Sequence, residues 1–299
     1  MTAAARGAHR ATRAADRRPR RRPDAANAAL AVWGVLVLVF LFLPIVFIVV
    51  QSFNGGRLLL VWDHFGTGAY RRALSDSSIT SAVGVSLRAA AGASVIATVL
   101  GTLAGVALAR RGGRWTVPFL AILGLTLVTP EIVDAVSLLP WFVWLGTDAH
   151  LSLFSNGLAR LVIGHSLFAT AVVVFIVRAR VEGLEESLEE AAADLYATPW
   201  RRFRDITVPL MAPAVLAGAL MAFTLSLDNT IISAFVQVSG STPWPVYVFS
   251  ALRSSLRPEI AAVSTLMLLL TLLALGLVAL VLRRSGESSR DIAGAMTGA

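Results

Sequence analysis

Three acidic residues lie within otherwise apolar segments of this 299-residue chain, namely Glu131, Asp134 and Asp228. A carboxylate in such a segment is costly, so each one is a candidate for function. Glu131 and Asp134 are three residues apart, which places them on one face of a helix, near its positively polarised end. Either they satisfy that helix end, or they stay ionised and face a cavity in which they attract a primary ammonium group. Asp228, in a polar cluster with positions 226, 229 and 230, either lines the mouth of such a cavity or hydrogen-bonds to neighbouring helices.

Other reactive side chains are scarce in this sequence. There is no Cys, and all 26 basic residues are Arg. The lack of Lys excludes a Walker-type phosphate loop and Schiff-base chemistry, and the lack of Cys excludes thiol nucleophiles and Cys-ligated metals. The four histidines, at positions 9, 64, 150 and 165, do not have the spacing of a metal site. We therefore expect neither a catalytic centre nor a metal site.

The composition indicates that lipid is the solvent of most of the chain. Apolar residues make up 56%, charged residues only 15%, and the mean hydropathy is +0.73. An uncharged run at 31–50 is long enough to cross a hydrocarbon core of about 30 Å, and we expect it to be retained because no cleavage site follows. Further apolar stretches lie at 80–109, 116–145, 157–178, 209–236 and 259–282. They predict an all-α integral membrane protein with six transmembrane helices at 28–284, between polar tails at 1–27 and 285–299.

The distribution of arginines predicts the orientation of these spans. With the amino terminus inside, 19 arginines fall on the cytoplasmic side and five on the outer side. Basic residues near span ends are retained in the cytoplasm, so both termini are predicted to be cytoplasmic. The eight arginines of the tail at 1–27 then form a cytoplasmic anchor rather than a nucleic-acid arm or a transit peptide, and no nucleic-acid partner is expected.

The third span is predicted to be a broken helix. It contains Pro130 and Pro140, and Thr129-Pro130 has the pattern of an N-cap followed by Pro at the first helical position. Irregular backbone at membrane depth requires surrounding protein or a water-filled cavity. Asp228 lies 19 residues beyond Pro209, which places it about 28 Å along the fifth helix, toward the outer leaflet.

The predicted cytoplasmic loop at 180–208 contains two short helices. Apolar residues at 184, 188, 191 and 195 recur at helical spacing, with acidic residues between them. Thr198-Pro199 begins a second helix, on which Trp200 and Phe203 share a face. A short amphipathic helix at the membrane face fits into a groove of a partner protein, and the alternative is a surface helix without a partner.

This loop resembles the loop of ATP-binding-cassette importer permeases. Their pattern is Glu-Ala-Ala, three residues, Gly, nine residues, Ile, one residue, Leu-Pro. This chain keeps that spacing with two substitutions, Tyr for Gly and Val for Leu: Glu190, Ala191, Ala192, Tyr196, Ile206, Val208 and Pro209. The resemblance implies the type I importer permease fold, with a coupling helix between spans four and five that docks in a groove of an ATPase. Gly at position 196 would permit a left-handed turn, which Tyr adopts only at a cost.

Other segments resemble one branch of that family, the second permease of spermidine/putrescine importers. They lie at 129–133, 223–229, 233–235 and 257–259, and the resemblance extends from about residue 33 to residue 284. It implies polyamine import across the bacterial inner membrane, and it favours the cavity interpretation of Glu131. The implied partners are an ATPase dimer that binds ATP and Mg²⁺, a homologous second permease and an extracytoplasmic binding protein, with no cofactor in this chain. Permeases for phosphonates, ferric iron and other solutes share the architecture, so these solutes remain alternatives.

Two further residues and two further hypotheses remain open at this point. If Arg88 lines a cavity for cations, it repels them unless a carboxylate pairs with it. If it lines the path without such a partner, an anionic solute becomes the better prediction. His165 is expected to make interhelical hydrogen bonds rather than to bind a ligand. A secondary transporter would explain the broken span and the carboxylates but not the loop. A membrane-embedded enzyme lacks the Glu-x-x-His pattern beside its carboxylates.

Overall fold

The computed structural model describes residues 25–110, 112–184, 186–254 and 256–284, and their regular structure is helical apart from one isolated bridge, Asn54–Phe65. This confirms the predicted all-α class. The chain divides into two compact units, 1–50 and 51–299, which are described separately. Of the predicted tails, residues 1–24 and 285–299 lie outside the described residues.

The described part of the first unit is helix α2, Ala25–Gln51, whose last residue opens the second unit. Large apolar side chains are exposed along its length, from Leu30 to Val50. A helix that is apolar all round requires lipid or another protein as its solvent. The helix therefore confirms the span predicted at 31–50.

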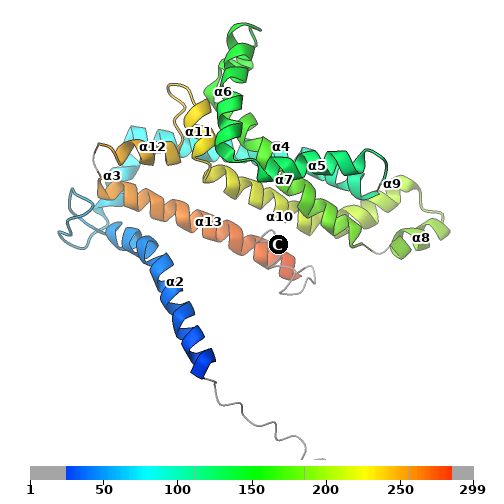
Figure 1. Ribbon diagram of the computed structural model, residues 1–299, viewed down its shortest axis with the longest axis horizontal. Helices are drawn as coiled ribbons and strands as arrows, with labels where there is room; N and C mark the ends of the chain where they lie inside the picture. The colour runs from blue at the N-terminus through cyan, green and yellow to red at the C-terminus, as the bar shows by residue number, and fades with distance from the viewer. Residues whose placement is uncertain (1–24, 111, 185, 255, 285–299) are drawn as a thin grey trace, which may run out of the picture. The chain divides into compact units, whose positions relative to one another are not determined.

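The second unit is a bundle of four long helices with shorter helices at its two ends. The long helices are α4 (Ser77–Arg110), α7 (Gly157–Glu182), α10 (Val208–Leu227) and α13 (Pro258–Arg284). At one end of the bundle lie α3 (Gly68–Ser75), α11 (Ile231–Val236) and α12 (Trp244–Ala251) (Figure 1). At the other end lie α8 (Glu186–Asp194), α9 (Pro199–Arg202) and the π-helical segment η2 (Phe203–Thr207).

Two helices between α4 and α7 form a sharply bent pair. These are α5 (Thr116–Val128) and α6 (Glu131–Thr147), which are inclined to each other by 102° and are followed by the short 3₁₀ turn η1 (Ser152–Ser155). Five described helical segments are long and apolar enough to span a membrane, and the bent pair makes a sixth if it counts as one span. Six spans, with the third one broken, are what the sequence predicts.

Two local predictions about these spans are wrong. Thr129 does not cap α6, because its hydroxyl donates to the carbonyl oxygen of Leu125 in the preceding helix (2.8 Å) and Pro130 precedes the first helical residue. The fifth span does not continue to residue 236, because α10 ends at Leu227 and a separate short helix, α11, follows. Polar residues at 228–230 interrupt the apolar run at this point, and the chain turns there.

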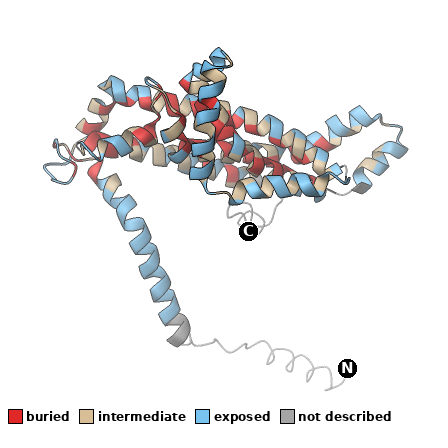
Figure 2. Ribbon diagram, turned by 45° about the horizontal axis from the view of Figure 1, so that its top comes forward, coloured by how far each residue is buried: buried red, intermediate tan, exposed pale blue. Residues whose placement is uncertain are grey.

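Small residues allow α4 and α7 to pack closely in the core of the bundle. Ala93 and Ala97 of α4 are fully buried, and Gly101 lies directly against Val173 of α7. A Cβ atom added at Gly101 would lie 2.6 Å from the Cβ atom of Val173, and one at Gly105 would lie 3.0 Å from the carbonyl oxygen of Val174. Figure 2 shows the buried residues concentrated along these packed helices. Close approach of this kind is how helices associate in lipid.

We expect Gly101→Leu to destabilise the protein by about 3 kcal/mol, because the larger side chain would overlap with Val173 and force the two helices apart. Gly124→Leu in α5 is the matched control, since no atom lies within 4 Å of a Cβ at that position. The measurement is thermal unfolding of the purified protein in detergent. Equal melting temperatures for the two variants would contradict the close packing.

Candidate functional site

The loop between α7 and α10 forms the two helices that the sequence predicts. The hydroxyl of Thr198 accepts a hydrogen bond from the backbone N–H of Arg201 (3.4 Å), and Pro199 occupies the first position of α9. The rings of Trp200 and Phe203 lie 6.0 Å apart between centroids, so they share a face. The loop is therefore a folded segment at one end of the bundle.

Tyr196 adopts the left-handed conformation that a Gly at this position would permit, and it does so at the cost expected for a residue with a Cβ atom. Its φ is +58°, in the turn that separates α8 from α9. The backbone N–H of Ala197 closes this turn on the carbonyl oxygen of Ala192 (3.0 Å). A side chain with a Cβ atom is strained in this region. The Tyr196 side chain is 95% exposed, so contacts within this chain do not compensate for the strain.

Several large apolar side chains of the loop face outward. Leu188, Leu195, Tyr196 and Trp200 are between 46% and 95% exposed. The predicted residues Glu190 and Ala191 are also exposed, whereas Ala192 and Ile206 are half-buried. Pro209, the second residue of α10, is exposed. Large exposed apolar side chains on one short loop are typical of a contact surface for another molecule.

Glu189 holds the loop to the long helix α4, a contact that the sequence did not predict. Its carboxylate accepts two hydrogen bonds from the guanidinium of Arg110, one of them 2.5 Å long, and a third from the hydroxyl of Thr207 (2.5 Å). Hydrogen bonding to Arg110 holds the pKa of the Glu189 carboxyl below its ordinary value; partial burial opposes this effect, and the Thr207 hydroxyl adds to it. The carboxylate therefore contributes stability above the ordinary pKa of Glu, and that contribution is lost only as the pH falls through the lowered pKa.

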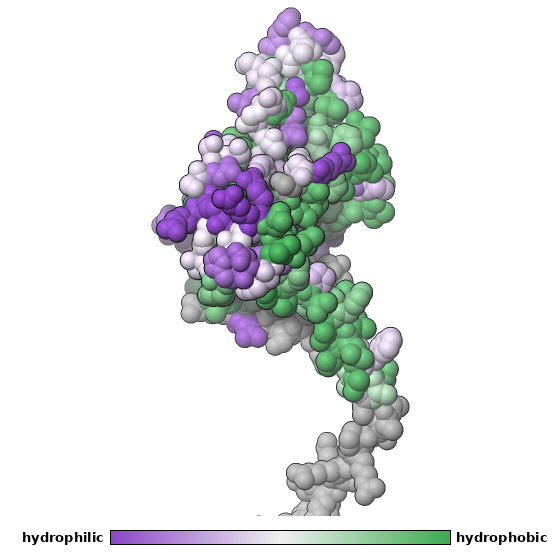
Figure 3. Space-filling model, turned by 90° about the vertical axis from the view of Figure 1, so that its left-hand side faces the viewer, coloured by the Kyte–Doolittle hydropathy of each residue, from purple (hydrophilic) through white to green (hydrophobic). Residues whose placement is uncertain are grey.

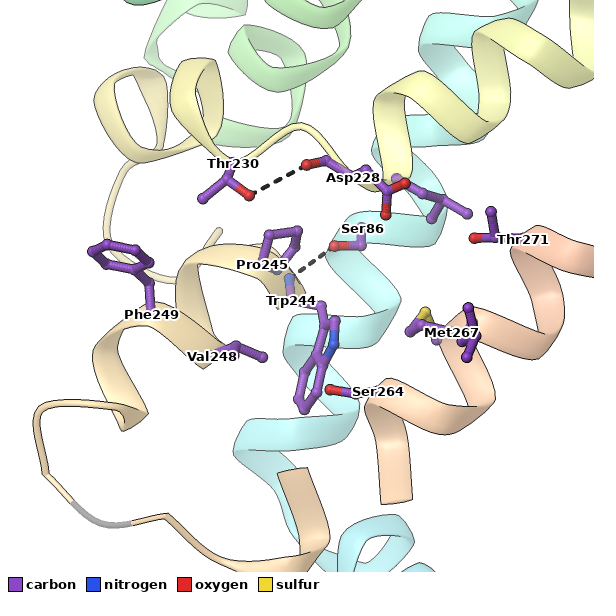
Figure 4. A pocket seen from close by; sticks show the side chains of 12 residues that line it. Ser86, Asp228, Thr230, Trp244, Pro245, Val248, Phe249, Ser264, Met267 and Thr271 are labelled. Carbon is purple, nitrogen blue, oxygen red and sulfur yellow. Dashed lines mark hydrogen bonds between the residues drawn. The ribbon is translucent and has the colours of Figure 1, made fainter. Parts of the chain in front are cut away.

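At the other end of the bundle, Asp228 lines a cavity of about 410 Å³. Asp228 follows directly after α10, and its carboxylate is directed into the space between Ser86 on α4 and Thr271 on α13 (Figure 4). The hydroxyl of Ser86 accepts a hydrogen bond from the backbone N–H of Trp244 (2.8 Å), which fixes the start of α12 against α4. The remaining lining residues are mostly apolar or aromatic: Leu227, Thr230, Trp244, Pro245, Val248, Phe249, Ser264, Met267 and Leu268.

Glu131 contacts the residue next to Asp228. Its carboxylate accepts a hydrogen bond from the side-chain amide of Asn229, whose oxygen in turn accepts from the N–H of Ile232 (3.1 Å) at the start of α11. The structure thus brings two of the three predicted acidic residues into one neighbourhood. Asp134 is half-buried one turn farther along α6, and neither it nor Glu131 lines the cavity.

The end of the bundle that carries α3 and α12 exposes apolar side chains beside hydrophilic ones (Figure 3). The loop at 51–66 belongs to this end, and the fully buried side chain of Asn54 holds it together. That side chain accepts hydrogen bonds from two backbone N–H groups of the loop and donates to two of its carbonyl oxygens. Large apolar residues on the loop, including Leu60 and Trp62, are exposed.

The structure also shows the positions of His165 and Arg88, the two further residues that the sequence left open. His165 is buried, and its ring nitrogens hydrogen-bond to the hydroxyls of Ser226 (2.7 Å) and Ser233 (3.0 Å), which confirms the predicted interhelical role. Arg88 is exposed and donates to the carbonyl oxygen of Gly84 in its own helix (2.9 Å). Among the described residues it makes no ion pair, and it does not line the cavity. The described part of the chain contains no group of three or more His, Asp or Glu that could hold a metal ion.

Comparison with known sequences shows clear relatives. Residues 97–287 match the family described as "Binding-protein-dependent transport system inner membrane component". The putrescine transport system permease protein PotI of Escherichia coli strain K12 is 40% identical over 243 residues, covering 79% of this chain and 85% of the relative. The spermidine/putrescine transport system permease protein PotC of Haemophilus influenzae is 32% identical over 252 residues, covering 84% of this chain and 95% of the relative.

Comparison with solved structures gives the same fold. A bacterial ABC transporter involved in the import of the acidic polysaccharide alginate contains a chain that superposes with a TM-score of 0.63 at 17% identity, covering 87% of this chain and 97% of that one. A chain of the MetNI methionine ABC transporter superposes with a TM-score of 0.52 at 16% identity, covering 70% and 99%. These superpositions show the fold alone, and together with the family match they confirm the predicted type I ABC importer permease fold.

We expect Tyr196→Gly to stabilise the protein by about 1 kcal/mol, because glycine adopts a positive φ without strain. Tyr196→Ala is the matched control: it also removes the exposed ring but keeps the Cβ atom, so the strain remains. Thermal unfolding of the purified protein measures both changes. If the alanine variant gains as much stability as the glycine variant, the effect comes from the ring and not from the backbone.

Proposed function

We propose that this chain, which belongs to the family of binding-protein-dependent transport system inner membrane components, forms half of a polyamine path driven by a separate ATPase. The family membership and the relatives establish that the chain is a membrane-spanning permease subunit of an ABC importer in the bacterial inner membrane. Such subunits are not enzymes themselves, and importers of this kind work with a binding protein and an ATPase. The solute and the roles of individual residues are the proposal.

The Asp228 cavity is the observation that carries the polyamine assignment. It offers a carboxylate, the hydroxyls of Ser86 and Thr230, and the aromatic rings of Trp244 and Phe249. A primary ammonium is attracted both by a carboxylate and by an aromatic face, and it donates hydrogen bonds to hydroxyl oxygens. The relatives are named for putrescine and spermidine, which are aliphatic chains with ammonium groups. An apolar wall beside these polar groups suits the methylene segments of such a solute.

Glu131 and Asp134 extend the acidic region beyond this cavity. Glu131 is joined to Asn229, next to Asp228, so a second negative charge lies close to the cavity wall. We assign Glu131 and Asp134 to the path by which the cation approaches or leaves Asp228. A series of carboxylates allows a cation to move from one site to the next without crossing an uncompensated apolar barrier.

The loop between α7 and α10 is the proposed contact with the ATPase. The exposed apolar side chains of Leu188, Leu195 and Trp200 need a partner surface, and the amphipathic helix α8 has the size of a groove-binding segment. The Glu190-Ala191-Ala192 pattern lies on this helix. ATP and Mg²⁺ would bind to the ATPase dimer rather than to this chain.

The remaining assignments concern topology and assembly. We assign both termini to the cytoplasm, together with the tails at 1–27 and 285–299, and we assign the coupling loop to residues 180–208. The other half of the path is contributed by a homologous second permease. The binding protein delivers the solute to the opposite face, at the end of the bundle that carries α3 and α12.

We expect Asp228→Asn to lower the rate of labelled putrescine uptake about tenfold or more, because the neutral amide no longer pairs with an ammonium group. Glu131→Gln should lower it less, since Glu131 does not line the cavity. The measurement is uptake by cells that express the complete transporter. Asp148→Asn is the control, because this exposed carboxylate directly follows α6 and does not line the cavity.

Unlabelled aminoethylphosphonate and ferric iron serve as competitors in the same assay. Neither competitor is expected to lower the uptake of labelled putrescine. If the parent transporter shows no saturable uptake of putrescine or spermidine, the polyamine assignment is contradicted and the importer assignment stays intact. Unchanged putrescine uptake by Asp228→Asn would remove Asp228 from the path.

A further inference from the structure

The contact between Arg110, Glu189 and Thr207, here called the clasp, joins three separate elements. Arg110 is the last residue of α4, Glu189 lies in the middle of α8, and Thr207 is the residue directly before α10. Both oxygens of the Glu189 carboxylate are engaged by the Arg110 guanidinium. The Thr207 hydroxyl donates to the same carboxylate and lies 3.5 Å from the Arg110 guanidinium. One carboxylate on the coupling helix thus holds two membrane-spanning helices.

The clasp can transmit a movement between helices better than an ion pair on the exposed surface can, because its side chains are partly buried and held at several points. The Thr207 residue is only 2% exposed, and the side chains of Arg110 and Glu189 are 33% and 24% exposed. A two-point contact between Arg and a carboxylate fixes orientation as well as distance. Side chains that are held at several points resist displacement, whereas a single exposed ion pair contributes little.

Two neighbouring ion pairs do not connect the loop to another helix. Arg178 and Glu182 pair one turn apart within α7 (2.7 Å), and Arg204 and Asp205 are adjacent in sequence and exposed. Either pair can break without releasing α8 from the bundle. The clasp differs because its partners are 79 residues apart in the sequence.

Both helices that the clasp holds also reach the Asp228 cavity, which α12 and α13 line as well. Arg110 and Ser86 lie on the same continuous helix, 24 residues and therefore about 36 Å apart. α10 begins directly after Thr207 and ends at Leu227, and both Leu227 and Asp228 line the cavity. A displacement of α8 that the clasp passes on would therefore move two walls of the cavity together.

We infer that Glu189, through Arg110 and Thr207, is the positioning residue that transmits movement of the coupling helix to α4 and α10 and so to the solute cavity. This inference rests on the proposed coupling role of the loop. The inference assigns two different functions to residues of α8. The exposed face of this helix contacts the ATPase, and Glu189, on the side toward the bundle, transmits the movement to the membrane-spanning helices.

The test uses the complete transporter in proteoliposomes, with its second permease, ATPase and binding protein, and labelled putrescine as the solute. We expect Glu189→Gln to keep the ATPase bound and ATP hydrolysis running, while the number of solute molecules imported per ATP falls about three- to tenfold. Thr207→Val and Arg110→Lys, which keep volume or charge but lose one hydrogen-bonding feature, should each lower the ratio by a smaller factor. Glu182→Gln is the matched control and should leave the ratio unchanged, because its partner Arg178 lies in the same helix.

If Glu189→Gln assembles poorly, a second test exchanges the charges of Glu189 and Arg110. Glu189→Arg alone should uncouple transport, and addition of Arg110→Glu should restore at least part of the lost ratio. An import ratio equal to that of the parent protein in Glu189→Gln, or no recovery in the reversed pair, would overturn the inference. The proposed function fails in a different way, namely if the ATPase does not co-purify with the parent protein or if deletion of residues 187–196 leaves uptake undiminished.

Discussion

The close contact between α4 and α7 is the constraint on which the rest of the structure depends. In lipid there is no hydrophobic drive to bring one apolar helix against another, so helices associate where their surfaces fit closely. Gly101 and Gly105 of α4 provide that fit, because their missing side chains leave room for Val173 and for the backbone of α7. Once α4 is fixed in this way, its two ends define the places of Ser86 at the cavity and Arg110 at the loop.

Polar contacts inside the bundle then fix the elements around the cavity. His165 of α7 holds Ser226 of α10 and Ser233 of α11 through its two ring nitrogens, and the hydroxyl of Ser94 donates to the carbonyl oxygen of Ala219 (2.6 Å). Each of these side chains satisfies its hydrogen bonding within the protein, which a buried polar group in an apolar medium requires. Asp228 is different, because among the described residues no cation pairs with its carboxylate. These hydrogen-bonded side chains thus lie in the same bundle as a carboxylate at the cavity that a cation can neutralise.

The sequence predicted those features that local patterns encode. Apolar runs predicted the spans, and Thr198-Pro199 predicted the start of α9. The spacing showed that Tyr196 stands where a Gly would permit a left-handed turn, and in the structure Tyr196 itself adopts that turn. It did not predict the 102° bend between α5 and α6, because a proline shows where a helix stops but not how the next helix leaves. It also missed the pairing of Glu189 with Arg110. Five acidic residues occur near this position with equal charge, and only the packed structure decides which one meets the end of α4.

The geometry of α4 also resolves the conflict that Arg88 raises for a cation path. Ser86 faces the cavity, and two residues along a helix correspond to a rotation of about 200°, so Arg88 lies on nearly the opposite side of α4. Its guanidinium turns back to the carbonyl oxygen of Gly84, which keeps the charge on its own helix. The cavity therefore has a carboxylate in its wall and no arginine among its lining residues. An arginine deep within a span opposes a cationic solute only if it faces the path, and here the helical repeat directs Arg88 away from the cavity that we propose as part of that path.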